Sequence, residues 1–149
     1  MDGLRYLIVD DSPTVRLTIR QALGQEKVPA SDVFEAGSAS EAVNVFERTH
    51  PQVVFLDITL SEGTAGAGSG AVLDILRQPR NPNQNGNDVA RYMRQKSPDV
   101  TIVVCTGNPA DDPRVRELVN AGAFQVLQKP VRLAQIREVL RAVQAERAN

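Results

Sequence analysis

The sequence lacks the features that mark disulfide-bonded, zinc-binding or membrane-spanning proteins. Its 149 residues include one cysteine, Cys105, and one histidine, His50. An internal disulfide is therefore impossible, and a zinc site of the usual kind would need more Cys and His. Lys and Arg number 17 against 18 Asp and Glu, and the net charge of −1 gives no overall attraction to nucleic acid. No apolar run approaches the roughly 18 residues of a membrane span, and the first residues show no signal-peptide pattern. We expect a cytoplasmic protein that binds neither nucleic acid nor membrane directly.

Short apolar runs alternate with amphipathic segments along the chain. The apolar runs predict five strands, at residues 4–9, 33–35, 52–57, 100–106 and 124–127. Apolar residues at helical spacing predict five helices, at residues 13–24, 38–48, 87–95, 112–121 and 133–145. This alternation predicts an α/β fold, a doubly wound five-stranded parallel sheet with right-handed crossovers and helices on both faces. The length suits one domain over residues 1–149.

One stretch interrupts the alternation. Residues 61–84 are rich in Gly, Ala, Asn and Pro, which predicts a long inserted loop. Within it, Val72, Ile75 and Leu76 would share one face of a short helix. A loop of this length inside a compact domain is unusual and is often functional, so a partner-binding role is one hypothesis for it.

The insertion leaves two possible starts for the third long helix. Gly70 and Gly86 each precede a segment of helical pattern. We favour the start at Gly86, because the chain then runs directly into the strand that ends at Thr106.

The central apolar run, at residues 53–56, ends in a carboxylate, Asp57. Such a run predicts a strand buried on both faces of a parallel sheet. Ligands and chemistry collect at the carboxyl edge of such sheets. Other predicted strand ends carry further polar groups, namely Asp10, Asp11, Thr106 and Lys129. Tens of residues separate these groups along the chain, so only the fold can bring them together.

Three carboxylates held close together repel one another unless one takes up a proton or a cation lies among them. Mg²⁺ would relieve this repulsion, since it binds carboxylate, carbonyl, water and phosphoryl oxygens. Phosphoryl transfer needs an in-line nucleophile and positive charge around the phosphoryl oxygens. Asp57 can be the nucleophile, and Mg²⁺, Lys129 and the Thr106 hydroxyl can stabilise the charge. The product would be an acyl phosphate on Asp57.

Five short motifs follow one another at the predicted strand ends and helix ends. They are Val9-Asp10-Asp11-Ser12, Phe55-Leu56-Asp57-Ile58, Thr106-Gly107, Ala121-Gly122-Ala123 and Lys129-Pro130. Together they resemble the CheY-like receiver domain of bacterial two-component response regulators. The resemblance covers nearly the whole chain and implies the strand order 2-1-3-4-5, the order of flavodoxin and CheY.

The resemblance also implies a role for each residue at the predicted edge. Asp57 would accept a phosphoryl group from a sensor histidine kinase or a histidine phosphotransfer protein. The implied Mg²⁺ ligands are Asp10, Asp11, Asp57 and the Thr59 backbone carbonyl. Thr106 would be the switch hydroxyl, and Lys129 would contact the phosphoryl group. Such a domain switches a surface that binds a downstream protein or output domain, so we expect a self-phosphorylating signalling domain rather than an enzyme.

The sequence departs from the family pattern at two single positions. Ser61 stands where receivers usually carry proline, and Val126 stands where they tend to carry Tyr or Phe. Together with the long loop, these departures support a second hypothesis, namely a pseudo-receiver, which is an interaction module that does not use phosphorylation. A third hypothesis is a haloacid-dehalogenase-like phosphatase. Such enzymes carry an Asp-x-Asp motif on their first strand. Here, in contrast, Asp10 and Asp11 are adjacent, and the isolated Asp57 follows the third predicted strand.

Simpler interpretations exist for several of these residues taken singly. Asp57 could cap the turn after its strand, and Asp10 with Asp11 could favour the N-terminus of the following helix electrostatically. We expect Cys105 to be a small core residue and His50 to be a solvated loop residue.

Overall fold

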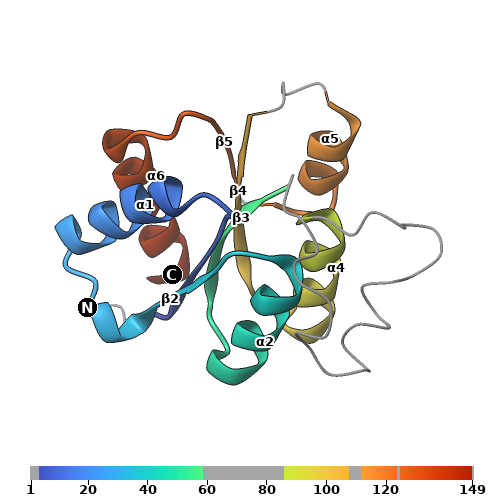
Figure 1. Ribbon diagram of the computed structural model, residues 1–149, viewed down its shortest axis with the longest axis horizontal. Coiled ribbons are helices and arrows are strands. Elements are labelled where there is room, and N and C mark those ends of the chain that lie inside the picture. Colours follow the sequence, from blue (N-terminus) through green and yellow to red (C-terminus); the bar gives the residue numbers. More distant parts are fainter. Residues whose placement is uncertain (1–3, 59–85, 108–111, 124, 149) are drawn as a thin grey trace.

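The computed structural model describes residues 4–58, 86–107, 112–123 and 125–148. Within these ranges, five parallel strands form one sheet in the order β2-β1-β3-β4-β5 (Figure 1). The strands are β1 (Tyr6–Val9), β2 (Val33–Ala36), β3 (Val53–Asp57), β4 (Thr101–Thr106) and β5 (Gln125–Gln128). The predicted fold class and strand order are therefore confirmed.

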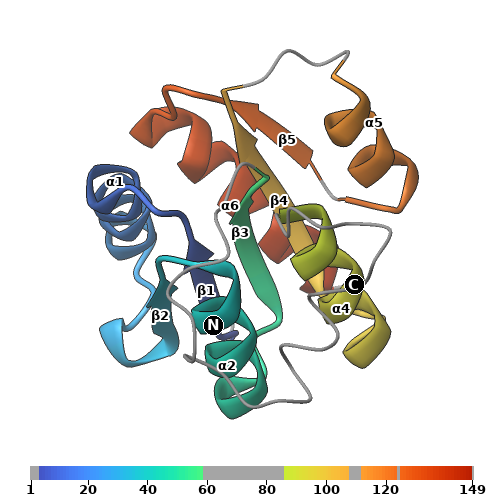
Figure 2. The same ribbon diagram turned by 45° about the vertical axis from the view of Figure 1, so that its right-hand side comes forward.

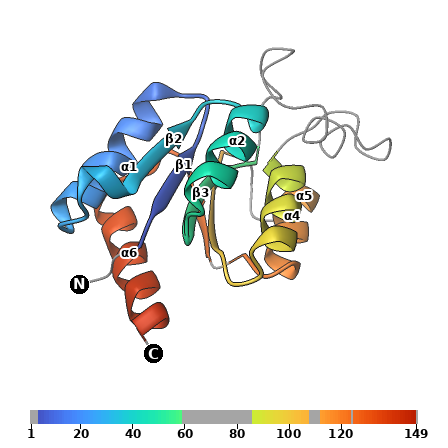
Figure 3. The same cartoon turned by 90° about the horizontal axis from the view of Figure 1, so that it is seen from below.

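Helices cover both faces of the sheet. They are α1 (Pro13–Gln25), α2 (Ala39–Thr49), α4 (Gly86–Lys96), α5 (Pro113–Asn120) and α6 (Leu133–Ala148), with a short 3-10 helix at Ala30–Asp32. Figures 1 and 3 show α1 and α6 on one face and α2, α4 and α5 on the other. Every strand therefore lies between two helical layers, as its apolar character requires.

The core consists of two clusters, one on each face of the sheet, because successive strand side chains point to opposite sides. One cluster joins α1 and α6 to the strand residues Tyr6, Ile8, Val53, Phe55, Val103 and Cys105. The other joins α2, α4 and α5 to the strand residues Leu7, Val9, Val54, Leu56, Ile102 and Val104. All five residues of β3 are buried, and each large apolar side chain buried in this way contributes about 1.5–3 kcal/mol.

The helices begin where their capping residues predict. The Ser12 hydroxyl accepts a hydrogen bond from the Val15 amide, and Pro13 is the first residue of α1. The Ser38 hydroxyl likewise accepts from the Glu41 amide at the start of α2. The Glu41 carboxylate accepts from the Gly37 amide at 2.8 Å, one residue earlier than a capping box requires.

The α4 helix starts at Gly86, as favoured from the sequence, and packs against α5, which lies above it in Figure 2. Its buried face is formed by Val89, Tyr92 and Met93, which are 0%, 3% and 0% exposed. The predicted insertion at 61–84, with its apolar segment and Ser61, lies outside the described residues.

Two element ends differ from the sequence prediction by more than one residue. The first strand begins at Tyr6 rather than at residue 4, and the last helix continues to Ala148 rather than ending near residue 145. A tertiary contact explains the longer helix. Arg147 Nη1 donates to the Asp99 carbonyl and to Thr101 Oγ1, both at 2.8 Å, and so fixes the last turn against the start of β4.

The core role predicted for the cysteine is confirmed, and the exposed histidine has a more defined place than predicted. His50 is the C-cap of α2, with a left-handed backbone conformation (φ 50°), and its amide donates to the Phe46 carbonyl. It therefore ends a helix rather than lying in a featureless loop. Cys105 is buried in β4, as expected of a core residue, and burial first, then the Asp10 charge, raises the pKa of its thiol to about 12. The thiol is therefore protonated and unreactive at neutral pH.

Candidate functional site

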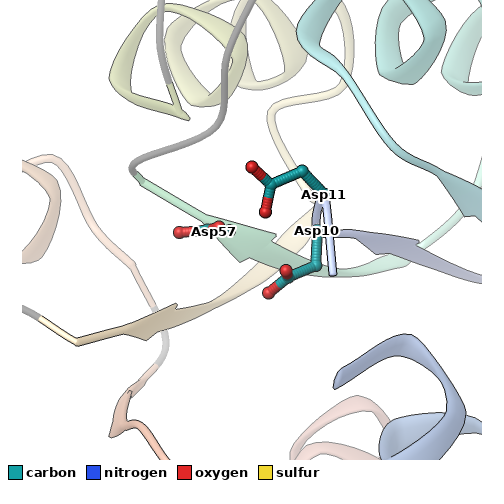
Figure 4. Close-up of side chains that lie close together, drawn as sticks. All are labelled: Asp10, Asp11 and Asp57. Atoms are coloured by element: carbon teal, nitrogen blue, oxygen red, sulfur yellow. The ribbon is translucent and has the colours of Figure 1, made fainter. Parts of the chain in front are cut away.

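Three carboxylates meet at the carboxyl edge of the sheet. Asp10 and Asp11 follow β1, and Asp57 ends β3, the strand that pairs with β1 through Val9 and Leu56. Each side chain contributes one oxygen to a group whose members all lie within 4.8 Å of one another (Figure 4). Asp10 and Asp57 are each 1% exposed, whereas Asp11 is exposed. Two of the three carboxylates are therefore buried, and solvent reaches the cluster at Asp11.

Lys129, the residue after the edge strand β5, reaches the carboxylates that follow β1 and end β3. Its Nζ lies 2.9 Å from Asp10 Oδ2 and 3.3 Å from Asp57 Oδ2. The Lys129 side chain is 22% exposed, so its ammonium can still be approached from solvent. One ammonium thus bridges two buried carboxylates that belong to neighbouring strands.

Thr106 brings Lys129 to this place. It is the last residue of β4, one position beyond Cys105, the residue that pairs with Asp57 across the sheet. The Thr106 carbonyl accepts a hydrogen bond of 2.7 Å from the Lys129 amide, and the Thr106 side chain is fully buried. The structure thus brings Asp10, Asp11, Asp57, Thr106 and Lys129 to one edge, as predicted. Thr59 lies outside the described residues.

Asp10 is the most constrained of the three acids. Its Oδ1 accepts from the Ser12 amide at 2.9 Å. Its Oδ2 is fully buried and lies 2.9 Å from Lys129 Nζ, yet it accepts no hydrogen bond of good geometry from the described residues. We regard this contact as an ion pair of poor hydrogen-bond geometry.

Burial raises the pKa of the Asp10 carboxyl above its ordinary value, and the neighbouring Asp57 charge adds to the increase. Lys129 and the Ser12 amide oppose the increase without cancelling it. The pKa of Lys129 is raised as well: burial would lower it, but its contacts with Asp10 and Asp57 outweigh burial. The lysine is therefore firmly charged, while the site as a whole disfavours so many carboxylate charges.

The residues present fit a hard divalent cation. Three carboxylates against one ammonium leave an excess of two negative charges at the edge. The oxygen of Asp10 that lacks a hydrogen bond, the exposed Asp11 and the buried Asp57 are all ligands of the type that Mg²⁺ prefers. A bound cation would remove the electrostatic cost that burial imposes on Asp10.

Arg16 is a residue of this region that the sequence did not suggest. It lies in the first turns of α1, and its Nη1 donates to the backbone carbonyl of Asp10. Its Nε donates to Glu35 Oε1 of β2 at 3.0 Å. Arginine in an amphipathic helix is usually part of the solvated face, so the sequence held no signal that separated Arg16 from Arg20.

Comparison with known proteins identifies the family. The family model for the response regulator receiver domain matches residues 6–81 and 72–141. This chain belongs to the response regulator receiver domain family. The two matched ranges overlap inside the predicted insertion at 61–84. The conclusion agrees with the strand order and with the acidic edge, and receiver domains are signalling domains.

Curated relatives include both short and long proteins. The chain is 26% identical over 141 residues to the chemotaxis protein CheY of Thermotoga maritima, covering 95% of this chain and 98% of that protein. It is 28% identical over 140 residues to the response regulator protein PilR of Pseudomonas aeruginosa, covering 94% of this chain. It is 30% identical over 126 residues to a protein-glutamate methylesterase/protein-glutamine glutaminase of Rhizobium etli, covering 85% of this chain. The chain spans only 26% of PilR and 30% of the methylesterase.

Solved structures show the same fold. The CheY-like receiver domain protein of Methanospirillum hungatei superposes with a TM-score of 0.72 at 22% identity, covering 96% of this chain and 94% of that one. The receiver domain of AraT from Geobacillus stearothermophilus superposes with a TM-score of 0.73 at 23% identity, with the same coverage. Among the described residues, no helix combines the length and apolar character needed to cross a bilayer.

Proposed function

We propose that this chain is a phospho-accepting receiver domain in which Asp57 takes a phosphoryl group from a sensor histidine kinase or a histidine phosphotransfer protein. The observation that supports this most is the Lys129 ammonium, which bridges Asp57 and Asp10 at 3.3 and 2.9 Å within a cluster of three carboxylates. A nucleophile, a cation and a set of oxygen ligands are thus adjacent.

The chemistry follows from these groups. One Asp57 carboxylate oxygen attacks phosphorus, so a bond from oxygen to phosphorus forms as the bond from phosphorus to the donor's imidazole nitrogen breaks. The Lys129 ammonium, released from carboxylate contact, binds a phosphoryl oxygen and offsets its charge. The Thr106 hydroxyl is the proposed donor to another phosphoryl oxygen.

Asp10, Asp11 and Asp57, with the Thr59 carbonyl, are the proposed ligands of Mg²⁺. When bound, this cation would supply positive charge that offsets the charge of the carboxylates and of the incoming phosphoryl group. The ion pair between Lys129 and Asp57 is the contact that phosphorylation must replace. Loss of that contact gives the site a way to report its state to the rest of the fold and to a downstream protein or output domain.

The proposed activity is limited to this one acceptor. The chain would phosphorylate itself and hydrolyse its own acyl phosphate, without turning over a metabolite, in the cytoplasm where its kinase acts. A haloacid-dehalogenase-like phosphatase is disfavoured because the two buried acids come from two strands: Asp10 follows β1 and Asp57 ends β3.

Incubation with acetyl phosphate and Mg²⁺, followed by intact mass measurement, tests the proposal. We expect the wild-type chain to gain one phosphoryl group and Asp57→Ala to gain none. Asp99→Ala is a matched control, because Asp99 is an exposed residue just before the amino end of β4, and it should behave like wild type. No gain in the wild type, or an equal gain in Asp57→Ala, would favour the pseudo-receiver instead.

A further inference from the structure

Arg16 of α1 connects β2 with the segment after β1 that carries Asp10 and Asp11. Its guanidinium donates through Nη1 to the Asp10 carbonyl and through Nε to Glu35 Oε1 at 3.0 Å. The Arg16 side chain is only 20% exposed. A second arginine, Arg20, contacts the other oxygen of Glu35 at 2.9 Å and is 39% exposed, but no described contact links it to Asp10.

Asp10 is consequently fixed from four directions. Its amide donates to the Ala36 carbonyl at 3.1 Å and its carbonyl accepts from Arg16. Its carboxylate accepts from the Ser12 amide and pairs with Lys129. The carbonyl contact is the one that acts on the peptide unit leading from Asp10 to Asp11, so it influences where both carboxylates point.

We infer that Arg16 is a positioning residue for the proposed Mg²⁺ site, holding Asp10 and Asp11 in place through the Asp10 carbonyl. This inference rests on the proposed function, since it assigns Arg16 a part in the same site. The geometry requires arginine because two donors of one planar fork serve two acceptors at once. A lysine ammonium is a single point of charge at the end of a flexible chain and cannot reproduce that arrangement.

Positioning and simple electrostatics make opposite predictions. Arg16 carries a positive charge close to the acidic cluster, so its charge alone would repel Mg²⁺ and weaken binding. If charge were its main influence, Arg16→Gln would bind Mg²⁺ more tightly than wild type. If positioning dominates, Arg16→Gln binds Mg²⁺ more weakly, because groups that orient metal ligands typically contribute about 10–100-fold in affinity.

The test is a calorimetric Mg²⁺ titration of the full chain and its variants, at fixed pH and ionic strength. We expect Arg16→Gln to bind about tenfold more weakly. Arg16→Lys, which keeps the charge and loses the fork, should also bind several-fold more weakly. Arg20→Gln is the matched control. It removes an arginine from the same carboxylate, Glu35, without touching Asp10, and should remain within about twofold of wild type.

A second readout separates positioning from loss of folded protein. The rate of acetyl phosphate labelling is measured against Mg²⁺ concentration for the same variants. A positioning role shifts the Mg²⁺ midpoint upward in Arg16→Gln, and excess Mg²⁺ restores the maximal rate. Loss of folded protein would lower the maximal rate and leave the midpoint unchanged.

Unchanged or tighter Mg²⁺ binding in both Arg16 variants would overturn the inference while leaving the proposed function intact. If Arg16→Gln fails to fold, the Arg16→Lys titration decides by itself. A wild-type chain that binds no Mg²⁺ and takes up no phosphoryl group would refute the proposed function, and this inference with it.

Discussion

Asp10 and Glu26 are two carboxylates that meet cationic side chains in different regions of this molecule, yet their pKa values move in opposite directions. Glu26 lies at the end of α1 and pairs with Arg137 at 2.7 Å and Arg141 at 3.2 Å, both on α6. The pKa of Glu26 is lowered, first by the Arg137 bond. The pKa of Asp10 is raised, first by burial.

The difference lies in burial and in the number of partners. The Glu26 side chain is 11% exposed and pairs with two arginines, whereas the Asp10 side chain is 1% exposed and shares one lysine with Asp57. The first arrangement satisfies a charge and joins α1 to α6. The second leaves buried negative charge only partly compensated, which has a cost in folding. The proposed cation would offset that cost.

Lys129→Ala should have the largest effect on this contrast, because it removes the ammonium that contacts both Asp10 and Asp57. We expect the metal-free chain to lose about 3 kcal/mol in free energy of unfolding, the low end for breaking a buried pair, since the lysine is partly exposed. Mg²⁺ binding should be retained, while the response to phosphorylation weakens. Urea unfolding with and without Mg²⁺ measures the first two effects. A stability equal to wild type without metal would contradict the role given to the ammonium.

Mg²⁺ itself should stabilise the wild-type chain. At 100 times its dissociation constant the gain is about 2.7 kcal/mol, because only the folded state gathers the three carboxylates. Asp11→Ala should reduce Mg²⁺ affinity and with it most of the gain at the same concentration. Thermal unfolding at several Mg²⁺ concentrations measures both chains, and equal shifts in the two would exclude Asp11 as a ligand.

Asp10→Asn should sharpen the contrast between Asp10 and Glu26, because it removes the buried negative charge of Asp10. Because the folded pKa of Asp10 lies above its unfolded value, the folded state holds its proton more tightly. Its contribution to stability is therefore lost as pH rises through the range above 3.8. The metal-free variant should be more stable than wild type at pH 7, by on the order of 1 kcal/mol, with the difference shrinking towards pH 4. Urea unfolding at pH 4 and 7 without Mg²⁺ measures it, and a variant less stable than wild type at pH 7 would count against this account.

Glu26→Gln should show the opposite pH dependence and the smallest effect. The folded pKa of Glu26 lies below its unfolded value of 4.5, so its contribution is present above that pH and is lost as pH falls through the folded pKa. At pH 7 the variant should lose about 0.5–1 kcal/mol, since the Arg137 and Arg141 side chains are 37% and 62% exposed and water screens both pairs. Below pH 4 the two stabilities should converge. A difference that grows on acidification would contradict this assignment.

Pattern alone predicted most of the fold and most of the site. The five strand ends could be assigned to one edge because parallel strands all present their carboxyl ends on the same side. Gly86 could be preferred as a helix start because the chain then runs directly into the strand that ends at Thr106. These features follow from the order of residues and from the common direction of parallel strands, and they do not depend on contacts between distant segments.

Side-chain contacts between distant segments could not be predicted from the sequence pattern. The Arg16 bond to the Asp10 carbonyl, the double pairing of Lys129 and the extension of α6 through Arg147 all depend on side-chain reach across the folded molecule. Residue type does not distinguish Arg16 from Arg20, since both are long, charged and on the same helix. Only their positions relative to Asp10 do.

The sequence by itself therefore determined the α/β alternation, the strand order through its family motifs, and the residues available at the carboxyl edge of the sheet. Tertiary structure alone decided which charges are buried, which are paired and which remain unsatisfied. The physical reason is that burial and pairing depend on distances of a few ångströms between segments far apart in the chain. The balance between these two effects is what moves the pKa of Asp10 up and that of Glu26 down.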